Sequence, residues 1–235
     1  MKITFLLTQS LESPGGGGRY LPLAKALARE GFTVTILALH HNYAHAKQRK
    51  FVVENVRVRY VGQMHVLKEG NHKTYFSTGP LLWIAFLATV RLFWAALWTN
   101  ADVIQVCKTQ PMNGVAAWGV HLLRRTPVFL DSDDYEAVNN RFVYEWQQRV
   151  VAWFERWMPS FASGITAGTS YIEKQFLDAG YPEQDLEIVR NGVERARFSI
   201  LKDGGFQEEL IALRHALQIK DEHNVVVYIG SMSLV

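Results

Sequence analysis

The chain is poor in cysteine, because Cys107 is the only one in its 235 residues. A single cysteine excludes an internal disulfide framework and indicates a reducing compartment. A secretory signal is also lacking, since MKITFLLTQS has one lysine and a short apolar run, and we interpret it as a first buried strand. Strong charge is lacking as well. The net charge of +3 suits an anionic ligand or an anionic membrane surface, but it is too small to indicate a nucleic-acid partner.

Two familiar nucleotide-binding motifs are missing, although four glycines, Gly15 to Gly18, follow the first apolar run. The dinucleotide pattern G-x-G-x-x-G fails because its sixth position would be Tyr20 or Leu21. The acidic residue that would hold a ribose after the second apolar run is replaced by histidines in LALHHNY. No Gly-Lys-Ser/Thr follows the glycines either. These absences argue against an NAD-dependent oxidoreductase, which we keep only as a rival hypothesis.

Short apolar runs alternate with helical patterns along the chain. Such runs are typical of parallel strands covered on both faces, so the order predicts an α/β fold with a Rossmann-like, doubly wound, mainly parallel sheet. The expected strands are residues 2–7, 32–39, 56–62, 102–107, 127–131, 164–169, 186–192 and 224–230. The expected helices are residues 21–28, 80–98, 113–125 and 141–157, and one that opens at Thr169 or Ser170.

The expected domain boundary lies near residue 200. Residues 1–200 would form the first domain, and residues 201–235 would be a linker, a helix and the first strand of a second, truncated domain. Residues 63–79 form a long, polar segment, which is expected to be a functional or mobile loop.

Two helical segments raise the question of membrane contact. Pro80 to Trp98 carries one charge, Arg91, and is near the length that spans a bilayer. We favour a buried helix, and keep a helix on the membrane surface and a spanning helix as alternatives. Residues 141–161 mix tryptophan with arginine, which fits either a core helix with extended arginines or a membrane interface.

The glycines occupy the first turn between strand and helix. A helix that starts near Arg19 would point free backbone N–H groups and its positive end at the crevice, and glycines leave that backbone bare. We therefore predict that Gly16, Gly17, Gly18 and Arg19 bind a phosphate or another anionic group, with Arg19 adding a bidentate contact. A flexible turn without a ligand is the alternative.

Polar residues also follow later strands. Lys108 comes directly after the fourth strand and could meet an anionic substrate or leaving group, whereas Cys107 is expected to be a packed thiol. After the fifth strand, LDSDDYE offers a group of carboxylates for sugar hydroxyls, helix capping or base catalysis: Asp131, Asp133, Asp134 and Glu136. His40, His41 and His45 could contact substrate or lie in a solvated loop. A metal site is not expected, because no further ligand pattern accompanies them.

The segment IVRNGVERARF, from Ile188 to Phe198, places Asn-Gly directly after a strand. Asn-Gly is a strong turn signal. Because this turn lies where the first domain should pass to the second, Arg190, Asn191 and Gly192 are predicted to form a hinge or an interdomain contact.

The order of these motifs resembles the N-terminal half of GT-B glycosyltransferases of the retaining family 4. The glycine loop with Arg19, the DDYE segment, ASGITAGTSYIEKQF, IVRNGVERARF and a strand ending in YIGSMS carry the resemblance. The resemblance implies two Rossmann-like domains facing a cleft. The N-terminal domain receives the acceptor, and the C-terminal domain holds a nucleotide-sugar, a UDP- or GDP-hexose, without a metal or other cofactor.

The resemblance also implies site roles. The glycine loop and Gly230, which would open the second domain's glycine loop, lie near the donor diphosphate. Lys108, Asp133, Asp134 and Glu136 would face the acceptor, and Lys108 stands near the position of a histidine in many relatives. The family's donor-binding Lys/Arg and its E-x7-E carboxylates would lie beyond residue 235. We therefore expect an isolated lobe that is inactive alone or works with a separately encoded donor domain.

The resemblance implies hexose transfer with retention for the complete enzyme. The arginine-bearing aromatic helices favour a glycan or lipid-linked acceptor in cell-envelope polysaccharide synthesis. We expect a cytoplasmic protein that can associate peripherally with the inner face of the plasma membrane.

Overall fold

The computed structural model describes residues 1–69, 72–140, 142–192, 206–220 and 222–227. The chain divides into two compact units, Met1–Gly192 and Val193–Val235. In the second unit the structure describes one helix, α7 (Gln207–Ala216). The assignment of residues 201–235 to the start of a donor-side domain stays a prediction.

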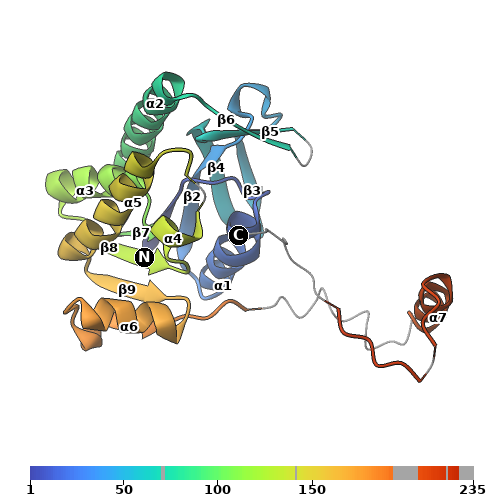
Figure 1. Cartoon of the computed structure of the whole chain (residues 1–235). Coiled ribbons are helices and arrows are strands. Elements are labelled where there is room, and N and C mark those ends of the chain that lie inside the picture. The colour runs from blue at the N-terminus through green and yellow to red at the C-terminus, as the bar shows by residue number, and fades with distance from the viewer. Residues whose placement is uncertain (70–71, 141, 193–205, 221, 228–235) are drawn as a thin grey trace. The chain divides into compact units, whose positions relative to one another are not determined.

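The first unit is built on a sheet of eight strands in the order β10-β9-β8-β7-β1-β2-β4-β3 (Figure 1). All neighbouring strands are parallel except the antiparallel pair of β3 and β4 at one edge. The strands are β1 (Lys2–Leu7), β2 (Thr33–His40), β3 (Lys50–Val53), β4 (Val56–Gln63), β7 (Val103–Cys107), β8 (Val128–Ser132), β9 (Gly164–Ala167) and β10 (Leu186–Ile188). The α/β, doubly wound, mainly parallel fold predicted from the sequence is confirmed.

The helices connect these strands. They are α1 (Leu21–Arg29), α2 (Thr78–Leu97), α3 (Pro111–Arg124), α4 (Glu136–Asn139), α5 (Glu145–Trp157) and α6 (Ser170–Asp178). Short helical turns cover Gly16–Tyr20, Tyr43–His45, Met158–Phe161 and Glu183–Asp185. The predicted cap of α6 is confirmed, because the Thr169 hydroxyl accepts a hydrogen bond from the Ile172 N–H at 3.2 Å.

The core has two parts, one on each face of the sheet. Alternate residues of a strand point to opposite faces, so Leu6 and Phe5 of β1 enter different clusters. One cluster packs the sheet against α2 and α3, and the other packs it against α1. Cys107 is buried as a packed thiol, as predicted.

Strand order reverses at β1, which lies between β7 and β2. In open α/β sheets this reversal opens a crevice beyond the carboxyl ends of the two strands, and ligands bind there. The segments that follow β1 and β7, which begin at Thr8 and Lys108, therefore line the expected ligand site.

Several expectations about elements were wrong. Residues 63–79 are not one loop, because β5 (Val66–Glu69) and β6 (His72–Tyr75) pair there as an antiparallel hairpin. The edge strand β3 was missed, and α5 begins at Glu145, after the short helix α4. The strand expected over residues 224–230 is not formed over 224–227, and 228–230 lie outside the described residues.

The glycine run also differs from its prediction. The chain is helical from Pro14, and Gly16–Tyr20 is a π-helical turn that leads into α1. The N–H of Gly17 donates to the Ser13 carbonyl at 2.9 Å, so it is not free. A Cβ on Gly16 would collide with the Ser10 carbonyl oxygen, whereas a Cβ on Gly18 would meet nothing within 4 Å. The first glycines thus allow the helix to lie directly on the preceding backbone.

The burial of helix α2 also differs from its prediction. It was favoured as a buried helix, but only 22% of its most apolar 18-residue window is buried. Ala88 and Leu92 face the core, while Trp83, Phe86 and Trp94 are exposed. The core accounts for one face of this helix only.

Candidate functional site

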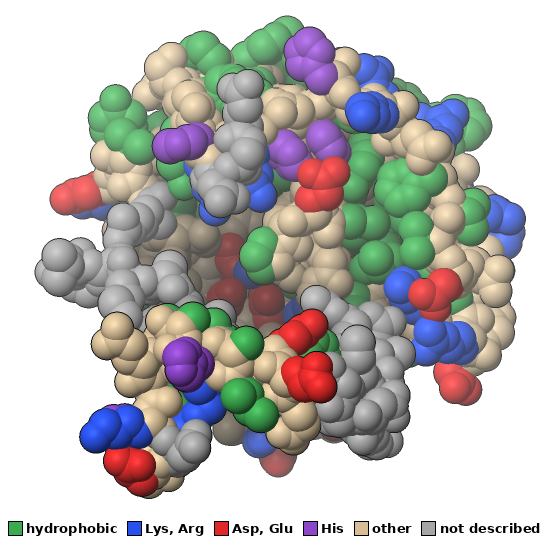
Figure 2. Space-filling model, turned by 90° about the vertical axis from the view of Figure 1, so that its right-hand side faces the viewer, with side chains coloured by type: hydrophobic (Ala, Val, Ile, Leu, Met, Phe, Trp, Pro, Cys, Tyr) green, Lys and Arg blue, Asp and Glu red, His purple; other side chains and the backbone are tan. Residues whose placement is uncertain are grey.

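A pocket of about 490 Å³ lies at the carboxyl ends of β1 and β7. Figure 2 shows this hollowed face, with acidic side chains deep in the hollow. Polar residues from the ends of several strands, Gln9, His65, Lys108 and Glu136, contribute to its lining. Glu12, Lys68 and Lys73 bring further charged groups to the lining. Apolar side chains from the β5–β6 hairpin, α2, α3 and α5 form much of the wall, among them Val66, Tyr75, Leu81, Met112, Trp146 and Val150. The site therefore combines polar and charged groups with extensive apolar walls.

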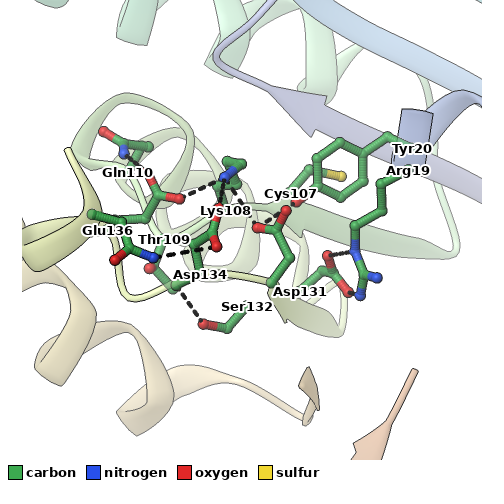
Figure 3. A network of polar contacts seen from close by, with 12 residues as sticks. Arg19, Tyr20, Cys107, Lys108, Thr109, Gln110, Asp131, Ser132, Asp134 and Glu136 are labelled. Atoms are coloured by element: carbon green, nitrogen blue, oxygen red, sulfur yellow. Dashed lines mark hydrogen bonds and ion pairs between the residues drawn. The ribbon is translucent and has the colours of Figure 1, made fainter. Parts of the chain in front are cut away.

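Lys108 is the centre of the polar cluster (Figure 3). Its Nζ lies 2.7 Å from Oε1 of Glu136, 3.1 Å from Oδ1 of Asp133 and 3.1 Å from Oδ2 of Asp134. All four predicted acceptor-side residues are thus brought together by the ends of β7 and β8. Whether they contact an acceptor stays a prediction.

The backbone at Lys108 is strained. Its φ is 68°, the left-handed region that non-glycine residues rarely occupy. The buried Asn113 supports this turn, because its Nδ2 donates to the carbonyl oxygens of Leu6 at 3.1 Å, Cys107 at 2.9 Å and Lys108 at 3.0 Å. Strain that is held by surrounding hydrogen bonds is common at functional sites.

The charges of this cluster depend on burial and on one another. Burial disfavours the ammonium of Lys108, but the carboxylates of Glu136, Asp133 and Asp134 outweigh it and raise the pKa of Lys108 above its usual range. Burial raises the pKa of Asp133, and Lys108 opposes that rise. Lys108 therefore stays protonated at neutral pH and holds the carboxylates in place.

Arg19 forms a second polar centre. Its Nε and Nη2 donate to the two carboxylate oxygens of Asp131 at 2.7 and 2.6 Å, and both side chains are buried. The Thr166 hydroxyl donates to Asp131 at 2.5 Å. Nη1 of Arg19 donates to Oδ1 of Asn191 at 2.8 Å. This network links the helical turn Gly16–Tyr20, which precedes α1, to β8, β9 and the segment after β10.

The short helix α4 is held by Glu155 of α5. The two carboxylate oxygens of Glu155 accept from the N–H groups of Glu136 at 2.6 Å and Ala137 at 3.1 Å. Burial raises the pKa of Glu155 to about 7, although these N–H groups oppose the rise. Glu155 thus positions the backbone that carries Glu136.

Two buried polar atoms of the pocket residues lack a hydrogen-bond partner within the described part of the chain. They are Nε2 of Gln9 and Nδ1 of His65. Buried polar atoms without a partner are costly, and native proteins usually satisfy them with water or a ligand. Gln9 and His65 both line the pocket, but these two atoms are themselves buried.

Comparison with known proteins decides the family. A search of curated proteins finds no match. The family model described as "Glycosyl transferase 4-like domain" matches residues 15–192. The chain belongs to the glycosyl transferase 4-like family. The matched range covers the glycine run, the Lys108 cluster and Asn191, and its end coincides with the end of the first compact unit.

Solved structures share the fold of this chain. Sucrose-phosphate synthase from Thermosynechococcus elongatus matches with a TM-score of 0.63 and 11% identity over 89% of this chain and 52% of that one. The Neisseria meningitidis UDP-GlcNAc 2-epimerase bound to UDP-GlcNAc matches with a TM-score of 0.56 and 12% identity, covering 94% and 54%. Anabaena HepE in complex with UDP-glucose matches with a TM-score of 0.53 and 17% identity, covering 89% and 50%. The chain spans about half the length of these proteins, and its fold is that of a GT-B N-terminal lobe.

Most of the remaining predicted site residues that the structure describes are exposed or have few contacts. Gly18, Arg190 and Gly192 are exposed, and Asn191 is exposed apart from its contact with Arg19. Gly230 lies outside the described residues. The donor-side role of Gly16, Gly17, Gly18 and Arg19 and the interdomain role of the Asn191 turn stay predictions, although Arg19 is already engaged by Asp131.

Two of the three histidines singled out in the sequence, His40 and His41, lie together. His40 and His41 stack with ring centroids 4.4 Å apart, and both approach the carboxylate of Glu12. The N–H of Asn42 donates to Nδ1 of His40 at 3.0 Å, so a neutral His40 carries its proton on Nε2, the atom that faces Glu12. A histidine that binds a metal through Nε2 carries its proton on Nδ1 and donates it to a neighbouring acceptor, which is the opposite arrangement. In the acidic cluster, the ammonium of Lys108 already occupies the place of a cation.

Sequence reasoning missed several residues of the lobe. Asn113 and Glu155 act through hydrogen bonds to backbone groups, and no sequence pattern marked either of them as a site residue. Gln9 and His65 were missed because the strand ends that bring them to one pocket are far apart in sequence. His65 also lay in a segment that was interpreted as a loop.

Proposed function

We propose that this lobe holds the acceptor in the transfer of a hexose, with retention, from a UDP- or GDP-hexose. The observation that carries the proposal is the pocket at the β1–β7 reversal in a chain of the glycosyl transferase 4-like family. HepE is solved in complex with UDP-glucose and the Neisseria epimerase is bound to UDP-GlcNAc, which supports a nucleotide-sugar as donor. The donor would be held mainly by a second lobe.

The acceptor is proposed to be amphipathic, with a sugar head and an apolar tail, as in a lipid-linked glycan. Carboxylates at the polar end, Asp133, Asp134 and Glu136, are strong acceptors for sugar hydroxyls. Gln9 and His65 are further polar residues of the lining. Apolar walls of this extent would be unfavourable around a purely polar glycan, but they suit a hydrocarbon tail.

Binding of alkyl glucosides to the 235-residue chain tests this proposal. Methyl, hexyl and octyl β-D-glucoside, each below its critical micelle concentration, would be titrated by calorimetry. At about 0.8 kcal/mol for each buried methylene, octyl glucoside should bind about tenfold more tightly than hexyl glucoside, and methyl glucoside should bind too weakly to measure. Equal affinities across the series would refute an apolar acceptor site.

A matched pair of variants assigns the binding to this pocket. Val150 lines the pocket and is 39% exposed, whereas Leu177 on α6 lies outside it and is 37% exposed. Val150→Asp should weaken octyl glucoside binding at least tenfold, and Leu177→Asp should leave it unchanged. An equal loss in both variants would show that the tail binds elsewhere.

A non-catalytic role is the second candidate, in which the lobe presents the acceptor to a separately encoded donor domain. It is favoured by the pairing of Arg19 with Asp131 and of Lys108 with three carboxylates, because these cations are already neutralised. We expect no hexose transfer when the chain alone is incubated with UDP-glucose and octyl glucoside. Product formation, followed with labelled donor, would contradict this expectation.

A further inference from the structure

Helix α2 presents an apolar stripe that the described structure does not cover. Residues at helical spacing line its outward side: Trp83, Phe86, Leu87, Val90, Trp94 and Trp98 at its C-terminal end. Trp83, Phe86, Trp94 and Trp98 are 61, 58, 52 and 75% exposed. Exposed apolar surface of this extent marks an interaction site.

The only charge of α2 belongs to Arg91, which is exposed and lies beside the stripe, on the side of the helix next to β4. The guanidinium of Arg91 lies 5.5 Å from the ring centroid of Tyr43, and the Arg91 side chain passes close to Gly62 of β4. The outward stripe itself is therefore uncharged. Among the described helices, α2 is the one long and apolar enough to cross a membrane, but Ala88 and Leu92 hold its other face in the core.

A cationic surface adjoins the C-terminal end of α2. Arg57 and Arg59 of β4 and Lys50 of β3 are exposed, and together with Trp98 they line a shallow groove. Val56 and Val58 alternate with them and pack toward α1, so Arg57 and Arg59 lie on the α2 side of the sheet. Lys50 pairs directly with Arg59 across the two strands.

This arrangement costs stability in an isolated protein. Like charges directly opposite in an antiparallel pair repel each other. Within the described residues, Lys50, Arg57 and Arg59 have no carboxylate partner. The sequence between Glu69 and Asp131 contains one acidic residue, Asp102, and its Oδ2 accepts from the Lys2 N–H at 2.7 Å. The segment that carries the stripe thus holds a single carboxylate.

We infer that the α2 stripe and the Lys50–Arg57–Arg59 groove form one surface that docks on an anionic lipid bilayer. The tryptophans would lie at the boundary between headgroups and acyl chains, and the cations would contact lipid phosphates. A second copy of the chain fits less well, because a two-fold dimer on this surface would bring the cationic grooves near each other. The inference is independent of the acceptor in the pocket.

Vesicle sedimentation of the whole 235-residue chain tests the inference. The probes are vesicles of phosphatidylcholine alone and of phosphatidylcholine with 30% phosphatidylglycerol. We expect tight binding to the anionic vesicles, at least tenfold weaker binding to the neutral ones, and loss of binding as salt increases. Equal binding to both vesicles, or binding to neither, would overturn the inference.

Charge variants test the groove. Arg57→Gln/Arg59→Gln should weaken binding to anionic vesicles about 30-fold, at about 1 kcal/mol for each cation near the surface. Arg149→Gln/Lys174→Gln removes the same charge from α5 and α6, where each cation has an exposed carboxylate partner. This control should change binding less than threefold. A similar loss in both variants would indicate attraction by net charge and would contradict a docking surface.

Aromatic variants test the stripe. Trp83→Gln/Phe86→Gln should abolish vesicle binding while leaving the melting temperature nearly unchanged, because both side chains are exposed. Tyr171→Gln/Leu177→Gln on α6 is the matched control and should bind as the parent does. Unchanged binding of the Trp83/Phe86 variant would overturn the inference. A dimer in light scattering that this variant dissociates, without vesicle binding by the parent, would identify a second copy as the partner instead.

Discussion

The glycine run offers a sharp test, because neighbouring glycines have different surroundings. An alanine Cβ at Gly16 would collide with the Ser10 carbonyl oxygen and would lie 2.9 Å from its carbon. These are backbone atoms that no rotamer change can move aside. An alanine at Gly18 would meet no atom within 4 Å. Both substitutions remove the same glycine flexibility, so the difference between them reports the collision.

The magnitudes follow from these contacts. Replacing a helical glycine with alanine stabilises a protein by about 0.5–1 kcal/mol, which is the whole effect expected at Gly18. Overpacking costs about 1–3 kcal/mol, so Gly16→Ala should be destabilising by about 1–2 kcal/mol overall. The two variants should therefore differ by about 2–3 kcal/mol.

Urea unfolding, followed by tryptophan fluorescence, measures this difference. With an m-value of about 2 kcal/mol/M, the midpoints of Gly16→Ala and Gly18→Ala should lie about 1 M apart, on opposite sides of the parent. Equal midpoints would refute the packing role of Gly16. A strong loss of stability in Gly18→Ala would refute the open surroundings of that residue.

Three further predictions concern the polar networks, and urea midpoints measure each of them. Asp131→Asn should cost about 3–5 kcal/mol, because it leaves the buried guanidinium of Arg19 without its carboxylate; a cost below 1 kcal/mol would contradict this. Asn113→Ala should cost about 2–3 kcal/mol, since three buried carbonyls lose their amide donor; a neutral result would show that water replaces it. The raised pKa of Glu155, about 7, means that the native state binds more protons than the unfolded chain between pH 4.5 and 7. Stability should therefore fall by about 1–3 kcal/mol as pH rises through this range and stay level above it. Glu155→Gln should remove this slope, and an unchanged slope would assign it to other groups.

The sheet could be predicted from the sequence because its strands are local, nearly continuous apolar runs. Most strand bounds agree within one or two residues, as for β1 and β4. The hairpin of β5 and β6 could not be predicted in the same way. Its residues are mostly polar, as in HKTY of β6, all four of which are exposed, so no apolar pattern marks the pairing.

The gathering of Lys108 with Asp133, Asp134 and Glu136 was predictable, because the carboxyl ends of adjacent parallel strands meet at one edge. The partner of Arg19 was not, because an arginine that follows a glycine run can face either solvent or the sheet. Its pairing with Asp131 depends on the close approach of the helix that Gly16 permits. Such a contact becomes visible only when the helix is placed against β8.

Helix α2 shows the limit of composition as evidence. An apolar stretch of 19 residues fits a core helix, a surface helix or a spanning helix equally well. The structure separates them because the small side chains of Ala88, Ala95 and Ala96 are buried in the core, whereas the tryptophans are exposed. The distribution of side-chain size around the helix was present in the sequence, but only the position of the sheet shows which side is covered.

The central claim is that the pocket at the β1–β7 reversal receives an amphipathic acceptor, and chemical-shift mapping tests it most directly. Octyl β-D-glucoside, below its critical micelle concentration, would be titrated into the ¹⁵N-labelled chain. The account predicts saturable shifts at the amides of Gln9, His65, Gln110 and Val150, which line the pocket. Shifts confined to the outward stripe of α2, with none at these amides, would contradict it.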